Sequence, residues 1–192
     1  MCTLCKNSEC ENGEMCGLAP YVAIPAVNAA IKRVQGIDSG FEAYGFGEQR
    51  YEGETTRPAP VTAVWSYIRR RAARCPYCKR SSITVWHIDH KMPWNAYLHQ
   101  MLGLNADAPL SMPLFIARVL GSDPNNLEPL CSSCNESKGD RIPGTPEFET
   151  WKRTREAWGR TQTGAPRRGM RLLDSDLARF VPRRRLSSDD ED

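Results

Sequence analysis

The spacing of apolar and polar residues predicts a chain of short helices and strands. From Val61 to Ile68 apolar side chains recur at helical spacing and arginines follow them, which predicts an amphipathic helix over 61–74. Ser82 to His90 is rich in β-branched and aromatic residues, so it is expected to form a strand that Pro93 ends. The remaining predicted elements are a helix near 26–34, two short helices within 94–120, a turn at 121–125, a strand at 126–130, and helices at 131–138 and 148–158.

This order of elements indicates an α+β fold with irregular flanks. Residues 1–19 are cysteine-rich and loop-like, and the Gly- and Pro-rich residues 20–60 are expected to wrap irregularly around the body. The expected divisions are an N-terminal extension (1–60), a central domain (61–145), a basic C-terminal helical region (146–185) and an acidic disordered tail (186–192).

The composition is that of a folded protein outside the membrane. Of the 192 residues, 40% are hydrophobic and 26% are charged, which is enough apolar material for a core. The longest uncharged run, Met15 to Ile31, is too short for a membrane span and contains two prolines. No basic segment followed by an apolar one begins the chain, so a secretory signal is not expected. We therefore expect the protein in the cytoplasm, or delivered into the cytoplasm of a target cell.

The formal net charge is only +3, but the charges are unevenly distributed. The segment 66–80 carries six basic residues and no acidic one, and 152–185 carries eleven basic residues against three acidic ones. A basic body suits a polyanion, of which nucleic acid is the most common. An ordinary solvated surface explains such charges equally well.

Two pairs of cysteines predict a structural zinc site. Cys75-Pro-Tyr-Cys78 and Cys131-Ser-Ser-Cys134 are Cys-x-x-Cys pairs from separate segments, the usual arrangement for tetrahedral zinc. The alternatives are disulfide bonds or a redox dithiol. The lack of a secretion signal argues against disulfides, and the lack of a thioredoxin-like βαβ pattern argues against redox chemistry. A site closed by four thiolates has no open position, so this zinc should not be catalytic.

A second set of cysteines lies near the N-terminus and has no recognisable signature. A second zinc site, disulfides, an iron–sulfur cluster and free thiols all remain open for it. Its members are Cys2, Cys5, Cys10 and Cys16.

The residues between and around the two Cys-x-x-Cys pairs carry the candidate chemistry. After CPYC come, in order, IDHKMP (88–93), NNLEPL (125–130) and CSSCNESKGD (131–140). This combination resembles the HNH nuclease family, whose core is a ββα-metal finger, over about residues 75–141. Each motif alone is weak evidence, but all of them in this order and spacing are specific.

The resemblance implies a role for each matching residue. His90 is the general base, and Asp89 is a ligand of a catalytic Mg²⁺ or Mn²⁺ ion. Asn126 braces the loop that orients the base, and Asn135 replaces the last histidine of the family motif as the second metal ligand. Phosphodiester hydrolysis needs such a base, to activate water, and a hard divalent cation, to neutralise charge on the phosphate. Strand alternation places Asp89 and His90 on opposite faces, so they can share a site only where the strand ends or bulges.

Other residues near the motif have two interpretations each. His87 is either a ligand or phosphate contact or, more simply, a strand residue with local contacts, and His99 is assigned no role. Lys138 and Arg141 either contact phosphate or belong to a solvated face. The aromatic residues of the last predicted helix either pack in the core or stack on bases. These aromatic residues are Phe148, Trp151 and Trp158.

The function expected from the resemblance is a metal-dependent endonuclease acting on double-stranded DNA, in a phage, restriction or antibacterial toxin setting. A toxin would have an inhibitor or immunity protein as partner, and cleavage of both strands would need a homodimer or two events. The competing class is a zinc-stapled nucleic-acid-binding module without cleavage activity. The connection between His90 and Asn126 is longer than usual in the family, so residues 94–120 are expected to pack as extra helices or to bind a partner.

Overall fold

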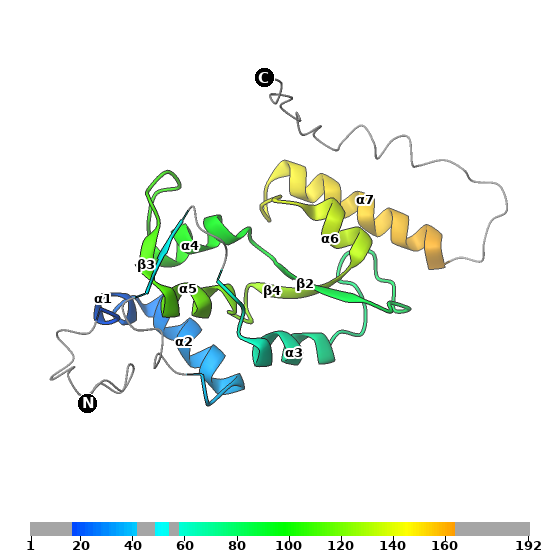
Figure 1. Cartoon of the computed structure of the whole chain (residues 1–192). Coiled ribbons are helices and arrows are strands. Elements are labelled where there is room, and N and C mark those ends of the chain that lie inside the picture. The colour runs from blue at the N-terminus through cyan, green and yellow to red at the C-terminus, as the bar shows by residue number, and fades with distance from the viewer. Residues whose placement is uncertain (1–16, 42–48, 54–57, 164–192) are drawn as a thin grey trace, which may run out of the picture.

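The computed structural model describes residues 17–41, 49–53 and 58–163, and its architecture is α+β, as the sequence predicts (Figure 1). The elements in chain order are α1 (Ala19–Val22), α2 (Pro25–Ile37), β1 (Arg50–Glu52), α3 (Thr62–Arg70), β2 (Trp86–His90), α4 (Trp94–Leu102), β3 (Ser111–Pro113), α5 (Leu114–Gly121), β4 (Leu127–Cys131), α6 (Ser132–Lys138) and α7 (Pro146–Thr163). Within these ranges no helix combines the length and the apolar composition that crossing a bilayer requires.

The strands form two small antiparallel sheets. β1 pairs with β3, and β2 pairs with β4. In the second sheet Asp89 lies opposite Glu128 and His90 lies opposite Leu127. Since α6 follows β4 directly, this part of the chain is a strand pair followed by a helix (Figure 1). β2 is shorter than the strand that the sequence predicts, because only its last five residues pair with β4.

The apolar core has two parts, and the β2–β4 sheet joins them. Ile88 and Leu127 pack in the larger part, which gathers side chains from α2, α3, α4 and α5, whereas Leu130 packs in the smaller part around the cysteines. Buried members of the larger part include Val34, Val64, Leu98, Met112, Phe115 and Ile116. Buried members of the smaller part include Tyr77, Phe148 and Trp151. The β2–β4 sheet therefore lies where the two parts of the apolar core meet.

The helix expected near 26–34 is present as α2, whereas the irregular wrapping expected for 20–60 is wrong for residues 17–41, which pack into the body of the molecule. Pro25 occupies the first turn of α2, where its missing N–H costs no helical hydrogen bond. The buried residues of α2 recur at helical spacing and belong to the larger core; they are Val27, Ala30, Ile31 and Val34. The core thus continues across residue 60, so the expected division there does not coincide with a break in the packing.

The segment 94–120 contains the two expected helices, α4 and α5, and a strand between them that the sequence analysis missed. That strand, β3, pairs with β1 and so ties this segment to residues 50–52. Gly103 ends α4 in the left-handed conformation, with φ at 66°. Gly121 ends α5 against the Trp94 ring, where a Cβ would lie 2.6 Å from a ring carbon. Only glycine therefore fits at this approach between α4 and α5.

Candidate functional site

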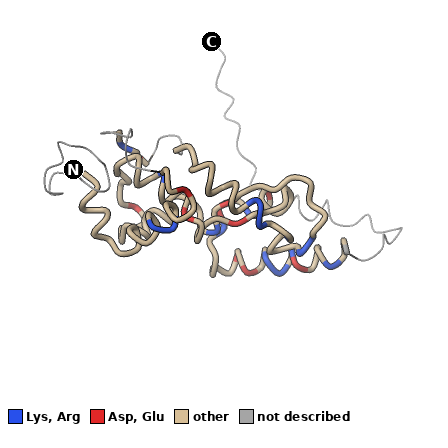
Figure 2. The backbone as a smooth tube through the Cα atoms, turned by 90° about the horizontal axis from the view of Figure 1, so that it is seen from below, with Lys and Arg blue, Asp and Glu red and all other residues tan. Residues whose placement is uncertain are grey.

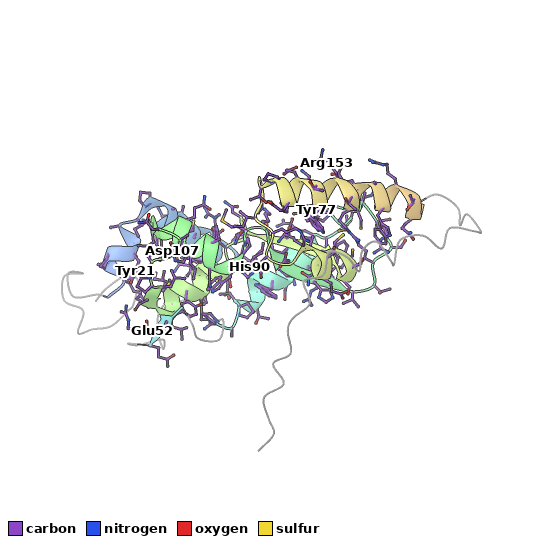
Figure 3. All side chains as sticks on the ribbon, turned by 90° about the horizontal axis from the view of Figure 1, so that it is seen from above. Tyr21, Glu52, Tyr77, His90, Asp107 and Arg153 are labelled. Carbon is purple, nitrogen blue, oxygen red and sulfur yellow. The ribbon has the colours of Figure 1, made fainter. Side chains whose placement is uncertain are left out.

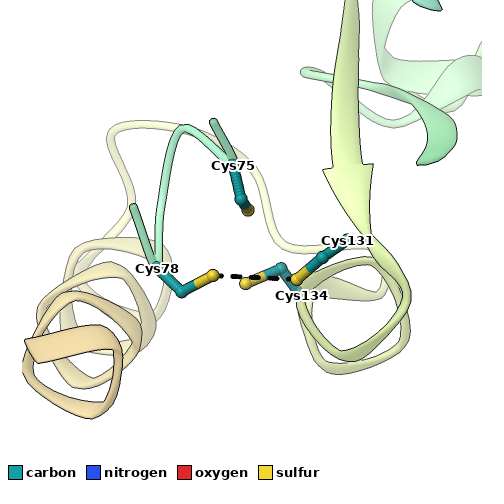
Figure 4. A group of neighbouring side chains, drawn as sticks. All are labelled: Cys75, Cys78, Cys131 and Cys134. Carbon is teal, nitrogen blue, oxygen red and sulfur yellow. Dashed lines mark hydrogen bonds between the residues drawn. The ribbon is translucent and has the colours of Figure 1, made fainter. Parts of the chain in front are cut away.

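The four central cysteines form one buried cluster (Figure 4). Cys75 and Cys78 come from the loop before β2, Cys131 ends β4, and Cys134 lies in α6. All four Sγ atoms lie within 4.8 Å of one another, and those of Cys78 and Cys131 are 3.7 Å apart. A tetrahedral site with Zn–S bonds of about 2.3 Å requires S···S distances of about 3.8 Å, whereas a disulfide bond is about 2.05 Å long. The cluster could therefore hold a metal ion such as zinc.

Two arginines supply positive charge to this cluster. Arg80 donates a hydrogen bond to the Cys131 Sγ at 3.5 Å, and Arg155, only 2% exposed, donates to the Cys134 Sγ at 3.3 Å. One divalent ion with four thiolates carries a net charge of about −2, which two guanidinium groups match. Hydrogen bonding between Cys75 and Cys134 lowers the pKa of the Cys75 thiol and raises that of the Cys134 thiol.

Helix α7 covers the cluster. The Trp158 ring contacts both guanidinium groups, with the Cζ of Arg80 at 4.5 Å and that of Arg155 at 4.2 Å from its centroid. A Cβ at Gly159 would lie 2.6 Å from the carbonyl carbon of Cys78, so the helix backbone rests directly on the loop. α7 carries both acidic and basic residues (Figure 2), and the burial of Arg155 removes it from the surface on which the sequence placed a basic flank.

Asp89 is held by a buried lysine. The Lys138 side chain is 1% exposed, and its Nζ donates to the Asp89 Oδ2 at 2.6 Å and to the backbone carbonyl of His90 at 2.5 Å. A lysine this deeply buried needs such acceptors, because an unpaired ammonium in the interior is costly. Lys138 thus faces a carboxylate inside the molecule, which does not fit the expectation that it contacts phosphate. Arg141 donates to the carbonyls of Ser137 and Lys138, so it completes the end of α6.

His90 lies near the middle of the molecule (Figure 3), and strand alternation directs its ring to the face opposite that of Asp89. Its Nε2 is 3.0 Å from the Gly121 carbonyl oxygen, and its ring centroid is 5.6 Å from that of Trp94. A carbonyl only accepts hydrogen bonds, so Nε2 carries a proton. Since β2 ends at His90, Asp89 and His90 lie together at the end of the strand even though their side chains turn to different faces.

Asn126 is buried, with 3% of its surface exposed, and it holds the chain that follows His90. Its Oδ1 accepts from the Met92 N–H at 2.8 Å, and its Nδ2 donates to the Met92 carbonyl at 3.2 Å. Its own carbonyl accepts from the Lys91 N–H at 2.7 Å. These three bonds fix residues 91 and 92 relative to β4, as a brace for the preceding histidine would.

Asn135, the other expected ligand, is half-buried in α6. The hydrogen bonds found in the described residues include none between Asn135 and Asp89. The structure therefore places both residues on adjoining elements, β2 and α6, without joining their side chains directly.

Sequence reasoning missed Glu128 and Tyr77. Glu128 is 7% exposed, lies opposite Asp89 in the sheet, and accepts a hydrogen bond of 2.7 Å from the Tyr77 hydroxyl. Burial raises the pKa of Glu128, although the Tyr77 hydroxyl and Lys138 act in the opposite direction. Pairing the two predicted strands would have placed Glu128 beside Asp89, but the sequence does not show the register. Two carboxylates and one buried ammonium therefore lie together at the start of β4.

The remaining candidates have local roles or lie elsewhere. His87 lines a surface pocket of about 530 Å³ together with Arg80 and Glu136. The ring nitrogens of His99 lie 2.7 Å from the Asn95 carbonyl and 2.8 Å from the Ala108 carbonyl, which indicates a structural residue. The three aromatic residues of α7 pack in the smaller core, which favours packing over base stacking. Cys2, Cys5, Cys10 and Cys16 fall outside the described residues, as do the expected tail and most of the basic segment 152–185.

The site has to be interpreted from its own geometry, since no protein-family model, no curated protein and no solved structure matches this chain.

Proposed function

We propose that this protein is a metal-dependent endonuclease of the HNH type that hydrolyses phosphodiester bonds in double-stranded DNA. One observation carries the proposal: Asp89 and His90 lie together at the end of β2, and Asn126 braces the chain that follows His90. The strand pair β2–β4 followed by α6 supports it, because the resemblance to the family rests on the same residues.

His90 is the proposed general base. Donation from Nε2 to the Gly121 carbonyl fixes the orientation of the ring that is proposed to take the proton from water. An imidazole is suited to this role because its ordinary pKa lies close to neutral pH. Asn126 contributes by holding residues 91 and 92, so that the backbone of His90 cannot drift.

Asp89 and Asn135 are the residues that would hold a catalytic Mg²⁺ or Mn²⁺ ion. A carboxylate and an amide oxygen are hard ligands of the type that these ions prefer, so the donor chemistry fits. When bound, such an ion supplies charge neutralisation at the phosphate and the leaving oxygen. Lys138 engages Oδ2 of Asp89, so this carboxylate would hold the cation while it is also paired with the ammonium.

The four-cysteine cluster is proposed as a structural zinc site. It joins the loop before β2 to the end of β4 and to α6, and thereby holds together the two strands that carry Asp89 and Glu128. Four thiolates close the coordination sphere, so the zinc has no position for water or substrate.

A second candidate, a nucleic-acid-binding module without cleavage activity, is favoured by the contact between Lys138 and Asp89. The ammonium already neutralises the carboxylate that the nuclease would use for its cation. In that case the cluster would remain a structural staple and the exposed arginines of α3 would supply the binding surface.

Plasmid cleavage separates the two functions. Purified protein is incubated with supercoiled plasmid and Mg²⁺ or Mn²⁺, and nicked and linear products are quantified for the wild type, His90→Ala, Asp89→Ala and the control His99→Gln. We expect nicking by the wild type and the control, and a loss of roughly 10²–10⁴-fold in His90→Ala because a general base acts in the chemical step.

Equal rates for His90→Ala and the wild type would overturn the assignment of the base. If the wild type binds DNA but cuts neither plasmid, linear duplex nor single strands with either ion, the binding module is the correct function. Expression of the wild type and Asp89→Ala in bacteria then tests the toxin setting, since a freely acting nuclease fragments the chromosome and the variant does not.

A further inference from the structure

A fully buried carboxylate lies beside the candidate active site and takes no part in the proposed chemistry. Asp123, in the loop between α5 and β4, is 0% exposed. Arg33 of α2 donates to both of its oxygens, from Nε to Oδ1 at 2.9 Å and from Nη2 to Oδ2 at 2.6 Å. The Tyr97 hydroxyl of α4 donates to Oδ2 at 2.6 Å. Three elements that are distant in sequence therefore meet at one side chain.

Asp123 is held as a charged group. Burial alone would raise its pKa, but the hydrogen bonds from Arg33 and Tyr97 more than compensate, and the pKa lies below its usual range. The hydrogen bond to Asp123 likewise raises the pKa of Arg33. A bidentate arginine–carboxylate pair of this kind is directional, so it fixes orientation as well as charge.

Asp123 also orders its own loop. Its Oδ1 accepts from the Asn125 N–H at 3.0 Å, and its backbone carbonyl accepts from the Asn126 N–H at 2.9 Å. The neighbouring Ser122 hydroxyl accepts from the Val61 N–H at 2.8 Å. The loop 121–126 is thus tied to the chain before α3, to α2 and to α4.

This loop contacts His90 and its neighbours from both of its ends. At its start, the Gly121 carbonyl accepts from the His90 ring at 3.0 Å. At its end, Asn126 binds the backbone of Lys91 and Met92. The orientation of the ring and the path of the chain after it therefore depend on one loop, and the side chain of Asp123 lies in the middle of that loop.

From these contacts we infer that Arg33, Tyr97 and Asp123 form a positioning network that sets the His90 imidazole for proton transfer. The inference rests on the proposed nuclease function, and it assigns part of the catalytic arrangement to α2, which lies outside the segment 75–141 that resembles the family. None of the three residues touches the reacting atoms. Their effect is on the step in which His90 acts, rather than on the binding of nucleic acid.

Amide hydrogen exchange and cleavage kinetics together test the network. Arg33→Gln removes the positive charge, and Arg33→Lys keeps the charge but cannot donate to both oxygens of Asp123 as the guanidinium does. Tyr97→Phe removes only the hydroxyl that donates to Asp123. The matched control is Val34→Ala, which trims a buried side chain of the same helix but keeps the groups that hydrogen-bond to Asp123. Exchange is followed at the backbone amides that the loop orders, namely those of Lys91, Met92, Asn125 and Asn126.

In Arg33→Gln we expect hydrogen exchange at these four amides to be roughly tenfold faster or more than in the wild type. In Val34→Ala we expect exchange at the same amides to accelerate only as far as the loss in the global free energy of unfolding accounts for. We expect kcat for plasmid nicking to fall by about 10- to 100-fold with KM nearly unchanged, because small displacements of a catalytic group have effects of this size. Arg33→Lys should recover part of both losses, and Tyr97→Phe should show a smaller change in the same direction.

The two readouts keep the outcomes distinct. Unchanged exchange in Arg33→Gln and Tyr97→Phe would overturn the network, whatever the cleavage result. Faster exchange with an unchanged kcat would show a loop without influence on His90, which also overturns it. If the wild type does not cleave DNA, the nuclease proposal has failed, and the exchange data still decide whether the network orders residues 91 and 92. If Arg33→Gln does not fold, Arg33→Lys and Tyr97→Phe decide by the same criteria.

Discussion

Replacing Gly159 with alanine tests whether α7 is seated on the cysteine cluster as closely as the structure indicates. In a solvent-exposed helix this change would stabilise the protein by about 1 kcal/mol, because glycine is a poor helix former. At Gly159, however, the new Cβ would lie 2.6 Å from the carbonyl carbon and 2.9 Å from the Cα of Cys78. The clash is with backbone on the Cys-x-x-Cys loop, so a change of rotamer cannot relieve it.

The magnitude follows from these opposing terms. Overpacking a well-filled site costs up to about 3 kcal/mol, and the rigid backbone at Cys78 argues for this upper value. Subtracting the helix-propensity gain of about 1 kcal/mol leaves a net loss of about 2 kcal/mol in the free energy of unfolding. For a chain of this size the loss corresponds to a fall in Tm of about 4–8 °C.

Gly36 provides the matched control. It also lies in a helix, α2, but nothing lies within 4 Å of the Cβ that alanine would add. Gly36→Ala should therefore raise the Tm by up to about 4 °C. Thermal unfolding monitored by circular dichroism, with the zinc content measured for each variant, compares the two directly. A Gly159→Ala protein as stable as the wild type would refute the close seating of α7.

Three further predictions concern the metal, the buried carboxylate and the basic surface. Cys131→Ser should lower the Tm and release zinc, because a structural metal contributes to folding; a folded, active and zinc-free variant in metal analysis would contradict the staple. Asp123 has a native pKa below that of the unfolded chain, so its charge stabilises the fold above about pH 4 and this contribution is lost as the pH falls through the native pKa. Asp123→Asn should therefore be less stable than the wild type at pH 7 in denaturant titrations, by a margin that narrows below about pH 4; an equal margin at every pH would count against an ionised Asp123. Replacing the exposed Arg70 and Arg74 together with glutamine should reduce the slope of log K against log[salt] for duplex DNA by roughly 2, and an unchanged slope would show that they do not contact phosphate.

The sequence predicts the local elements well because their signals are local. The apolar spacing before Cys75 and the run of β-branched and aromatic residues before His90 depend on neighbours within one segment. α3 forms within the first pattern, and β2 forms over the last five residues of the second. The four cysteines likewise carry their own signal, since the spacing of each pair suits one ion.

Pairings between distant segments could not be predicted in the same way. The bond between Arg33 and Asp123 joins positions 90 residues apart, and nothing in either segment indicates the other. The burial of Lys138 is also a tertiary property, because Asp89 lies on another element and the register of the sheet brings the two together. From the sequence alone Lys138 could be interpreted as a phosphate contact, and only the fold shows that Asp89 lies next to it.

The pairing of β2 with β4 also has a consequence for the order in which the molecule folds. The two strands are joined by residues 91–126, which themselves contain α4, β3 and α5, so this sheet closes a long loop. Long loops are slow to close, because their entropy is lost before the new contacts stabilise the structure. During synthesis the Asp89–Lys138 contact must wait until α6 has left the ribosome, and the Arg155 contact to the cluster must wait for α7. The candidate site consequently cannot form in a chain that ends before β4 and α6.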